Sequence, residues 1–117
     1  MDIKNELQRA EELQITVKGW RSGREISLQV WFAVEGDSLL LLPVKGSASP
    51  WFKNLLNNPA IEVKAASTTW RGKARVVRTR ARVNHVADLF RARYSPELVA
   101  KYYSRFDVCA EVPLKSG

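Results

Sequence analysis

The chain has 117 residues, enough for one hydrophobic core and too few for two independent cores. Its 45% hydrophobic and 26% charged residues are typical of a globular domain, and its single cysteine, Cys109, excludes an intramolecular disulfide. Lys and Arg number 19 against 12 Asp and Glu, and the net charge of +7 favours an anionic partner such as nucleic acid, an acidic membrane surface or a phosphorylated cofactor. Because neither a signal segment nor a membrane span is visible, we expect a single cytoplasmic domain over residues 1–117.

The first third of the chain changes from helical to strand periodicity. Ile3, Leu7 and Ala10 recur at helical spacing and predict an amphipathic helix over about residues 2–12, with Asp2 as a candidate cap. From Leu13 the apolar residues recur at every second position, which predicts a half-buried strand. A second alternating run predicts a strand over residues 25–34, whose core face carries Ile26, Leu28, Val30, Phe32 and Val34.

A hairpin and a fully buried strand follow. Gly36 supplies any positive φ that the turn needs. Residues 38–44 are apolar on both faces, so we expect both faces to be covered, with a second subunit as one candidate cover. Pro50 then starts a helix that runs to about residue 57, with Ser47 or Ser49 as its cap.

The second half predicts two more strands, two helices and a closing strand. Residues 61–65 alternate, and a basic strand spans residues 70–82, with a bulge near Val76 and Val77 because its cations change parity. Helices are predicted from Asn84 to about Arg91 and from Ser95-Pro96 to Tyr103, before a strand over residues 108–114. Six strands with short helices predict a mainly β fold, a small antiparallel barrel with its helices outside.

Two short loops combine glycine, serine and cations. Arg21, Ser22, Gly23 and Arg24 follow the first strand, and Lys45-Gly46-Ser47 precedes the helix at Pro50. We expect the two loops to lie close together and to form an anion cradle, because Arg, Lys and backbone N–H groups all bind phosphate oxygens. The plainer alternative for each loop is a turn with no ligand.

The sequence that follows these loops is more specific. Pro50-Trp51-Phe52-Lys53-Asn54-Leu55, followed by Asn58-Pro59, resembles the deazaflavin-dependent nitroreductase and quinone reductase family, a branch of the pyridoxamine-phosphate-oxidase-like flavin-binding split barrels. The pattern also includes Gly19, Ser22, Gly23, Arg24, Gly36, Asp37, Lys45 and Gly46.

The resemblance implies a six-stranded antiparallel split β-barrel of Greek-key type, usually a homodimer. It implies that Arg21, Ser22 and Gly23 hold the cofactor phosphate and that residues 27–29 lie beside the ring. The implied cofactor-binding set is Arg21, Ser22, Gly23, Arg24, Ser27, Leu28, Gln29, Lys45, Gly46, Ser47, Pro50, Trp51 and Asn54. Trp20 and Ile26 stand where the family has cations, so FMN is an alternative to the deazaflavin coenzyme F-420.

Tyr94 and Tyr102 are candidates for facing the substrate, because the family places aromatic residues in this region. Packing is the plainer role for them and for Tyr103. His85 is expected to lie in the first turn of a helix without a catalytic role, and a single His and a single Cys argue against a metal site.

The favoured function is an oxidoreductase that moves a hydride from reduced F-420 or FMN to a small molecule such as a quinone, a nitro compound or another activated double bond. One alternative is a non-catalytic flavin, deazaflavin or haem binding protein of the same fold. A nucleic-acid module built on the basic strand and Trp70 is less favoured. We expect a homodimer, because residues 39–42 and Trp31 need covering.

Overall fold

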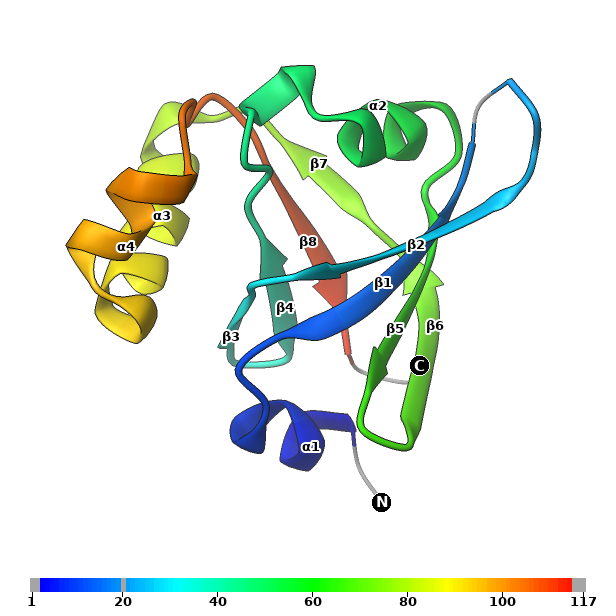
Figure 1. Cartoon of the computed structure of the whole chain (residues 1–117), viewed down its shortest axis with the longest axis horizontal. Helices are drawn as coiled ribbons and strands as arrows, with labels where there is room; N and C mark the ends of the chain where they lie inside the picture. Colours follow the sequence, from blue (N-terminus) through cyan, green and yellow to red (C-terminus); the bar gives the residue numbers. More distant parts are fainter. Residues whose placement is uncertain (1–2, 20, 115–117) are drawn as a thin grey trace.

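The computed structural model describes residues 3–19 and 21–114 and contains two four-stranded antiparallel sheets (Figure 1). The first sheet has the order β2 (Glu25–Val30), β1 (Leu13–Lys18), β5 (Ala60–Ala65) and β6 (Thr68–Lys73). The second has the order β3 (Ala33–Glu35), β4 (Ser38–Leu41), β8 (Cys109–Pro113) and β7 (Arg75–Val77). The helices are α1 (Ile3–Arg9), α2 (Pro50–Asn57), α3 (Arg80–Tyr94) and α4 (Pro96–Tyr102), and a 3-10 turn, η1, spans Gly46–Ala48.

The fold is mainly β as predicted, but it is not a closed barrel of six strands. Two of the predicted strands bend and pass from one sheet to the other. The run over residues 25–34 becomes β2 and β3, with Trp31 and Phe32 between them. The basic run breaks at Ala74 into β6 and β7. A strand that changes sheets must bend at the corner, so each long strand counts once in each sheet.

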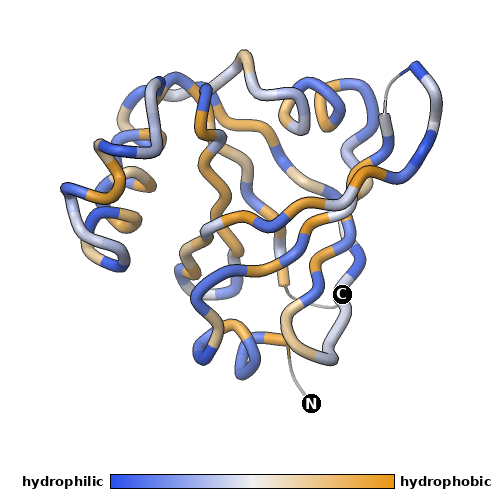
Figure 2. Tube along the Cα trace, viewed as in Figure 1, coloured by the Kyte–Doolittle hydropathy of each residue, from blue (hydrophilic) through white to orange (hydrophobic). Residues whose placement is uncertain are grey.

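The main core fills the space between the two sheets. Leu13, Ile15 and Val17 of β1 point into it, and β5 contributes Ile61, Val63 and Ala65, so the predicted alternation of both strands is confirmed. Figure 2 shows this alternation along the trace. In Figure 1, α1 lies at one end of this core and α2 at the other.

A second core layer lies between the second sheet and the helices α3 and α4. Strand β4 serves both layers: Leu39 and Leu41 belong to the main core, and Leu40 packs with Val86 and Phe90 of α3. Leu39 to Leu42 are all fully or almost fully buried within one chain. The expectation that this run needs a second subunit as its cover is therefore corrected.

Helix α3 starts at Arg80, four residues before the predicted Asn84. Its first turns are fixed by contacts that are distant in sequence. Arg82 binds Glu35 of β3 at 2.9 Å and Glu111 of β8 at 3.0 Å, and the His85 Nε2 lies 2.6 Å from the Glu35 Oε2. Hydrogen bonds from His85 and then Arg82 lower the pKa of Glu35. The last basic residues of the predicted strand therefore belong to a helix.

The remaining predicted elements are largely confirmed. Helix α2 spans Pro50–Asn57, and α4 begins at Pro96, where the Leu98 N–H donates to the Ser95 hydroxyl at 3.2 Å. Helix α1 is shorter than predicted, and its candidate cap Asp2 lies outside the described residues. Within the described chain, no helix is both long and apolar enough to cross a membrane.

Candidate functional site

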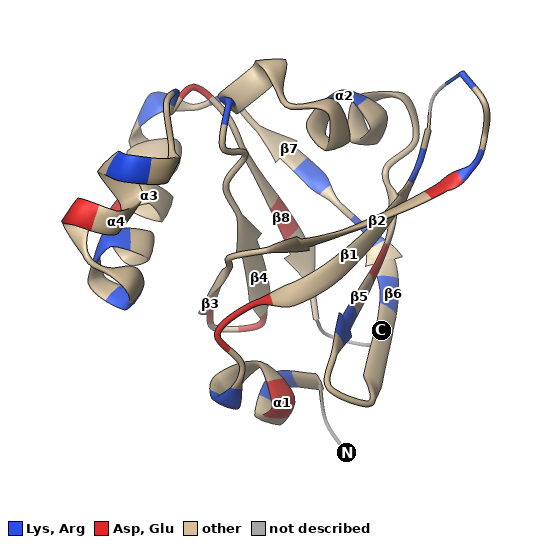
Figure 3. Cartoon of the chain, in the orientation of Figure 1, with Lys and Arg blue, Asp and Glu red and all other residues tan. Residues whose placement is uncertain are grey.

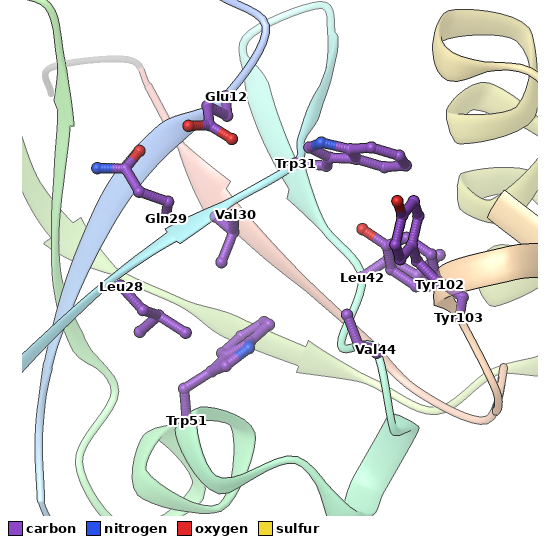
Figure 4. A pocket seen from close by; sticks show the side chains of 10 residues that line it. All are labelled: Glu12, Leu28, Gln29, Val30, Trp31, Leu42, Val44, Trp51, Tyr102 and Tyr103. Carbon is purple, nitrogen blue, oxygen red and sulfur yellow. The ribbon is translucent and has the colours of Figure 1, made fainter. Parts of the chain in front are cut away.

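A groove of about 420 Å³ opens between β2, α2 and α4, a volume in the range of small-molecule sites. Figure 4 shows its walls: β2 crosses above it, Trp51 rises from α2 below, and the two tyrosines at the end of α4 close one side. The lining residues are Glu12, Leu28, Gln29, Val30, Trp31, Leu42, Val44, Trp51, Tyr102 and Tyr103.

Strand β2 supplies the wall that faces α2. Leu28 is paired with Ile15 and Val30 with Leu13, so both point to the inner side of the sheet. They are only half-buried, and Ile26 farther along is 43% exposed. The prediction that this whole face lies in the core is corrected at Ile26, which is exposed on an edge strand. Leu28 and Val30 pack against the main core and also line the groove.

The groove has an aromatic corner around Trp31. The Trp31 ring stacks on Tyr94, with centroids 4.2 Å apart and planes 8° apart, and meets the edge of Tyr102 at 5.6 Å. Tyr102 is 50% exposed, whereas Tyr103 is buried and burial raises its pKa. Tyr102 therefore presents its phenol to solvent and the groove, and Tyr103 remains neutral within the wall.

Tyr94 does not line the groove, although the sequence suggested that it faces a substrate. Its hydroxyl donates to the backbone oxygen of Glu11 at 2.6 Å and accepts the Phe32 N–H at 3.2 Å. Arg93 also donates to this hydroxyl at 3.1 Å. Tyr94 thus supports Trp31 from behind and satisfies the backbone at the bend between β2 and β3.

The loop between β1 and β2 is exposed, and hydrogen bonds within the loop stabilise it. The Gly23 N–H donates to the Gly19 oxygen at 2.8 Å, and the Arg24 N–H donates to the Ser22 hydroxyl at 3.1 Å. Gly23 has a φ of 70° and nothing lies within 4 Å of the position that a Cβ would take. The side chains of Arg21 and Arg24 are exposed at the tip of this loop, which is basic in Figure 3.

The loop before α2 is instead anchored by Asp107, from the connection between α4 and β8. The Asp107 carboxylate accepts the Ser47 N–H at 2.9 Å and the Ser47 hydroxyl at 2.6 Å. The Ser49 hydroxyl accepts the Lys45 N–H at 2.9 Å rather than capping the helix N–H groups. The donors of Ser47 that sequence offered to a cofactor are therefore engaged inside the protein.

The sequence predicted that the two loops lie close together, but in the structure they are apart. Figure 1 places them at opposite ends of α2, with the tip between β1 and β2 projecting beyond one end and η1 at the other. The residues of the predicted single cradle therefore lie in two separate loops along one helix. The groove adjoins the second loop, since Val44 and Trp51, which flank that loop, both line it, and on the side of the first loop its wall is Leu28 of β2.

The structure brings four of the sequence-predicted site residues into the groove: Leu28, Gln29, Trp51 and Tyr102. Ser27 lies on the opposite face of β2, with its hydroxyl 2.8 Å from that of Thr16, and Asn54 is buried in α2 while Pro50 is exposed. The groove residues that sequence reasoning missed are Glu12, Val30, Trp31, Leu42, Val44 and Tyr103. The shared parity of Leu28 and Val30 on one strand was the available signal for Val30.

The part of the chain that the structure describes shows neither a metal site nor a reactive thiol. Among the described residues there is no group of three or more His, Cys, Asp or Glu that could hold a metal ion. Burial raises the pKa of the Cys109 thiol to about 11, with the nearby Glu111 as a second cause, so this thiol is protonated at neutral pH.

Comparisons with solved structures support the fold. The chain is 20% identical to an F420-H2 dependent reductase (FDR-A), over 87% of this chain and 93% of that one, with a TM-score of 0.67. It is 18% identical to an F420 reductase, over 97% and 93%, with a TM-score of 0.71. The heme storage protein HutZ from Vibrio cholerae is 16% identical, over 98% and 89%, with a TM-score of 0.74.

The family model for F420H(2)-dependent quinone reductase matches residues 2–108, which is most of the chain. A search of curated proteins finds no match. The match agrees with the resemblance carried by the loops and by the Pro50-Trp51 helix start, and it extends well beyond them. The chain therefore belongs to the F420H(2)-dependent quinone reductase family.

Proposed function

We propose that this protein is an oxidoreductase that passes a hydride from reduced coenzyme F-420 to a small planar acceptor of the quinone type. The observation that carries the proposal is the groove between β2, α2 and α4, in a chain whose family is F420H(2)-dependent quinone reductase. Apolar walls and a few polar groups at the rim suit a flat ring system with a polar edge. The bound coenzyme supplies the hydride chemistry, and the protein supplies position and environment.

In this proposal the groove walls hold the ring and exclude water. Trp51 from α2 and Leu28 from β2 both line the groove, and in this proposal a planar ring lies against them. Gln29 also lines the groove, but its side chain points away from Leu28 and Val30 in Figure 4, as the alternation of β2 requires, so the walls and not this amide hold the ring. These contacts orient the reacting carbon toward the side of the groove formed by Trp31 and Tyr102.

Tyr102 is the residue that we assign to the acceptor. Its phenol is half-exposed, lines the groove and can donate a hydrogen bond to a carbonyl or nitro oxygen. Such a bond stabilises the negative charge that grows on the acceptor during hydride transfer. Tyr103 and Trp31 form the apolar wall beneath that oxygen.

The anionic part of the coenzyme needs cations near the groove. The loop between β1 and β2, which carries Arg21 and Arg24, lies at one end of α2, and the turn η1, which directly follows Lys45, lies at the other. Arginine binds phosphate bidentately, and exposed guanidinium groups at a loop tip are accessible to a tail that extends from the groove. FMN, which has one phosphate, is the alternative cofactor that fits the same apolar walls.

An anaerobic titration tests this function. The protein is mixed with reduced F-420, and menadione is then added while the absorbance of the oxidised coenzyme is followed. Binding with reoxidation that depends on the protein is the expected result. Binding without reoxidation would favour a carrier or storage protein. Binding of FMN but not of F-420 would show that FMN is the cofactor.

We also propose a homodimer, although the Leu39–Leu42 argument for it has been corrected. Its present support is the exposure of Ile26 on edge strand β2 and of Leu56 on α2, at 43% and 48%. One solved structure with a TM-score of 0.69 and 17% identity is described as a domain-swapped dimer. Light scattering at several protein concentrations checks the mass, and a monomer at all of them would contradict the proposal.

A further inference from the structure

The carboxylate of Asp107 sits where an anionic ligand would meet the loop before α2. One oxygen accepts the Ser47 N–H at 2.9 Å and the other accepts the Ser47 hydroxyl at 2.6 Å. A backbone N–H and a serine hydroxyl that converge on one anion form the arrangement that proteins also use for phosphate. In this chain the anion is one of its own side chains, 60 residues away in sequence.

Two neighbouring features show that this contact is built into the fold. Gly46 has a φ of 56°, and a Cβ there would overlap the Asp107 Oδ1 and lie 2.9 Å from the Arg105 Cγ. The Ser104 N–H donates to the Val44 oxygen at 2.9 Å, so the connection after α4 is joined to this loop at a second point. The absence of a side chain at residue 46 lets the carboxylate come this close.

The Asp107 side chain is charged at neutral pH. Its hydrogen bonds from Ser47 are the first cause that lowers its pKa, and Arg105, whose Nε lies 3.1 Å from the Asp107 Oδ2, adds to the shift. A second anion at Ser47 would therefore need to displace a charged carboxylate from its donors and would meet repulsion from it.

We propose that Asp107 is an internal anion that closes the Lys45–Ser47 end of the groove to phosphate, and so directs the phosphate of a bound ligand to the Arg21–Arg24 loop at the other end of α2. This inference rests on the proposed function in one respect, that the groove binds a flavin-like ring. It makes Asp107 a residue that determines specificity and that acts without touching the ring. It also removes Lys45, Gly46 and Ser47 from the phosphate site and leaves that role to Arg21 and Arg24.

The test compares riboflavin with FMN, because the two share a ring and differ by one phosphate. Dissociation constants are measured by quenching of flavin fluorescence for the wild type, for Asp107→Asn and for Asp88→Asn. Asp88 is an exposed carboxylate on α3 paired with Arg91, so its variant removes the same charge away from the groove. We expect Asp107→Asn to raise the preference for FMN over riboflavin by about fivefold, because it removes the negative charge and one of the two acceptor oxygens at Ser47. We expect Asp88→Asn to leave the preference within about twofold.

A second variant keeps the proposal testable if Asp107→Asn does not fold. Lys45 is exposed, so Lys45→Gln should fold normally. In the wild-type background this variant should leave the preference for FMN within about twofold, since the phosphate lies elsewhere, and in the Asp107→Asn background it should remove the gain. A clear loss of FMN preference from Lys45→Gln alone would show that phosphate reaches the loop and would overturn the inference.

The outcomes separate this inference from the proposed function. If riboflavin and FMN both bind but Asp107→Asn leaves their ratio unchanged, the role of Asp107 is refuted and the groove remains a ring site. If neither flavin binds and the two deazaflavins, F-420 and its phosphate-free chromophore, also fail to bind to the wild type, the ring site itself is refuted.

Discussion

The two loops at the ends of α2 are similar in sequence and opposite in structure. Both combine glycine, serine and a cation, and both have a glycine with positive φ, at Gly23 and Gly46. Around Gly23 the space is open and the hydrogen bonds are local. Around Gly46 the space is filled by residues 105 and 107, which arrive from the far end of the chain. Local sequence therefore specifies donors, and tertiary packing decides whether a ligand can reach them.

Alanine at the two glycines should give the largest contrast. Gly46→Ala adds a strained backbone and a collision with Asp107, so we expect the free energy of unfolding to fall by about 2–4 kcal/mol. Gly23→Ala adds the backbone strain alone, at a cost of about 1 kcal/mol. Urea denaturation measures both free energies of unfolding. Equal losses would mean that the Asp107 side chain moves away from the added methyl group without a loss of stability.

The next effect in size is the dependence of stability on pH at Asp107. Because its pKa is lowered in the folded protein, its contribution is complete above about pH 4 and is lost as the pH falls through the folded pKa. At pH 7 we expect Asp107→Asn to cost about 1 kcal/mol, allowing for a side chain that is 34% exposed, and the difference from wild type to narrow in acid. Thermal denaturation at several values between about pH 3 and pH 7, a range that includes the ordinary carboxyl pKa, measures this stability difference. Asp88→Asn is the control. A difference that stays constant over this range would contradict the prediction.

Tyr102→Ala tests the aromatic side of the groove, which the end of α4 supplies. The half-exposed ring contributes to ligand contact more than to the core, so we expect ring affinity to fall by about five- to tenfold with little change in unfolding free energy. Leu98→Ala removes a side chain on the same helix that is 40% exposed and does not line the groove. Fluorescence titration of both variants with riboflavin gives the comparison, and an equal effect would remove Tyr102 from the site.

The smallest expected effect is at the open loop. Arg24→Gln removes one exposed cation, so FMN should bind about threefold more weakly while riboflavin is unaffected. The loss should shrink with added salt, because the guanidinium is solvent-exposed. The same titration at low and high salt measures this effect, and equal weakening of both flavins would place the role of Arg24 in the fold rather than in phosphate binding.

Much of the fold could be predicted because its periodicity is local. Strands β1 and β5 alternate cleanly, and α2 is bounded by Pro50 and Pro59. The bends at Trp31-Phe32 and at Ala74 were missed because the alternation runs through the first without a change of parity, and the parity change near the second was read as a bulge. The helix predicted for α3 was too short, because the first turns of α3 are fixed by Glu35 and Glu111, which are distant in sequence.

The candidate site was predicted only where its residues lie within the sequence pattern of the family. Leu28, Gln29 and Trp51 belong to the segment that carries the family pattern, and the structure places all three in the groove. Glu12 and Tyr103 come from two other segments, and only the packing of the sheets and helices brings them to the groove. Asp107 has no local signal, since its partner Ser47 belongs to another loop.

The hydroxyl of Tyr94 has a consequence for how the chain folds. It accepts the N–H of Phe32 at the corner between the two sheets, from a position 62 residues later in the chain. The hairpin of β3 and β4 pairs residues that are close in sequence and can form early, whereas this corner must wait for the end of α3. We therefore expect the angle between the sheets, and with it the shape of the groove, to become fixed late in folding.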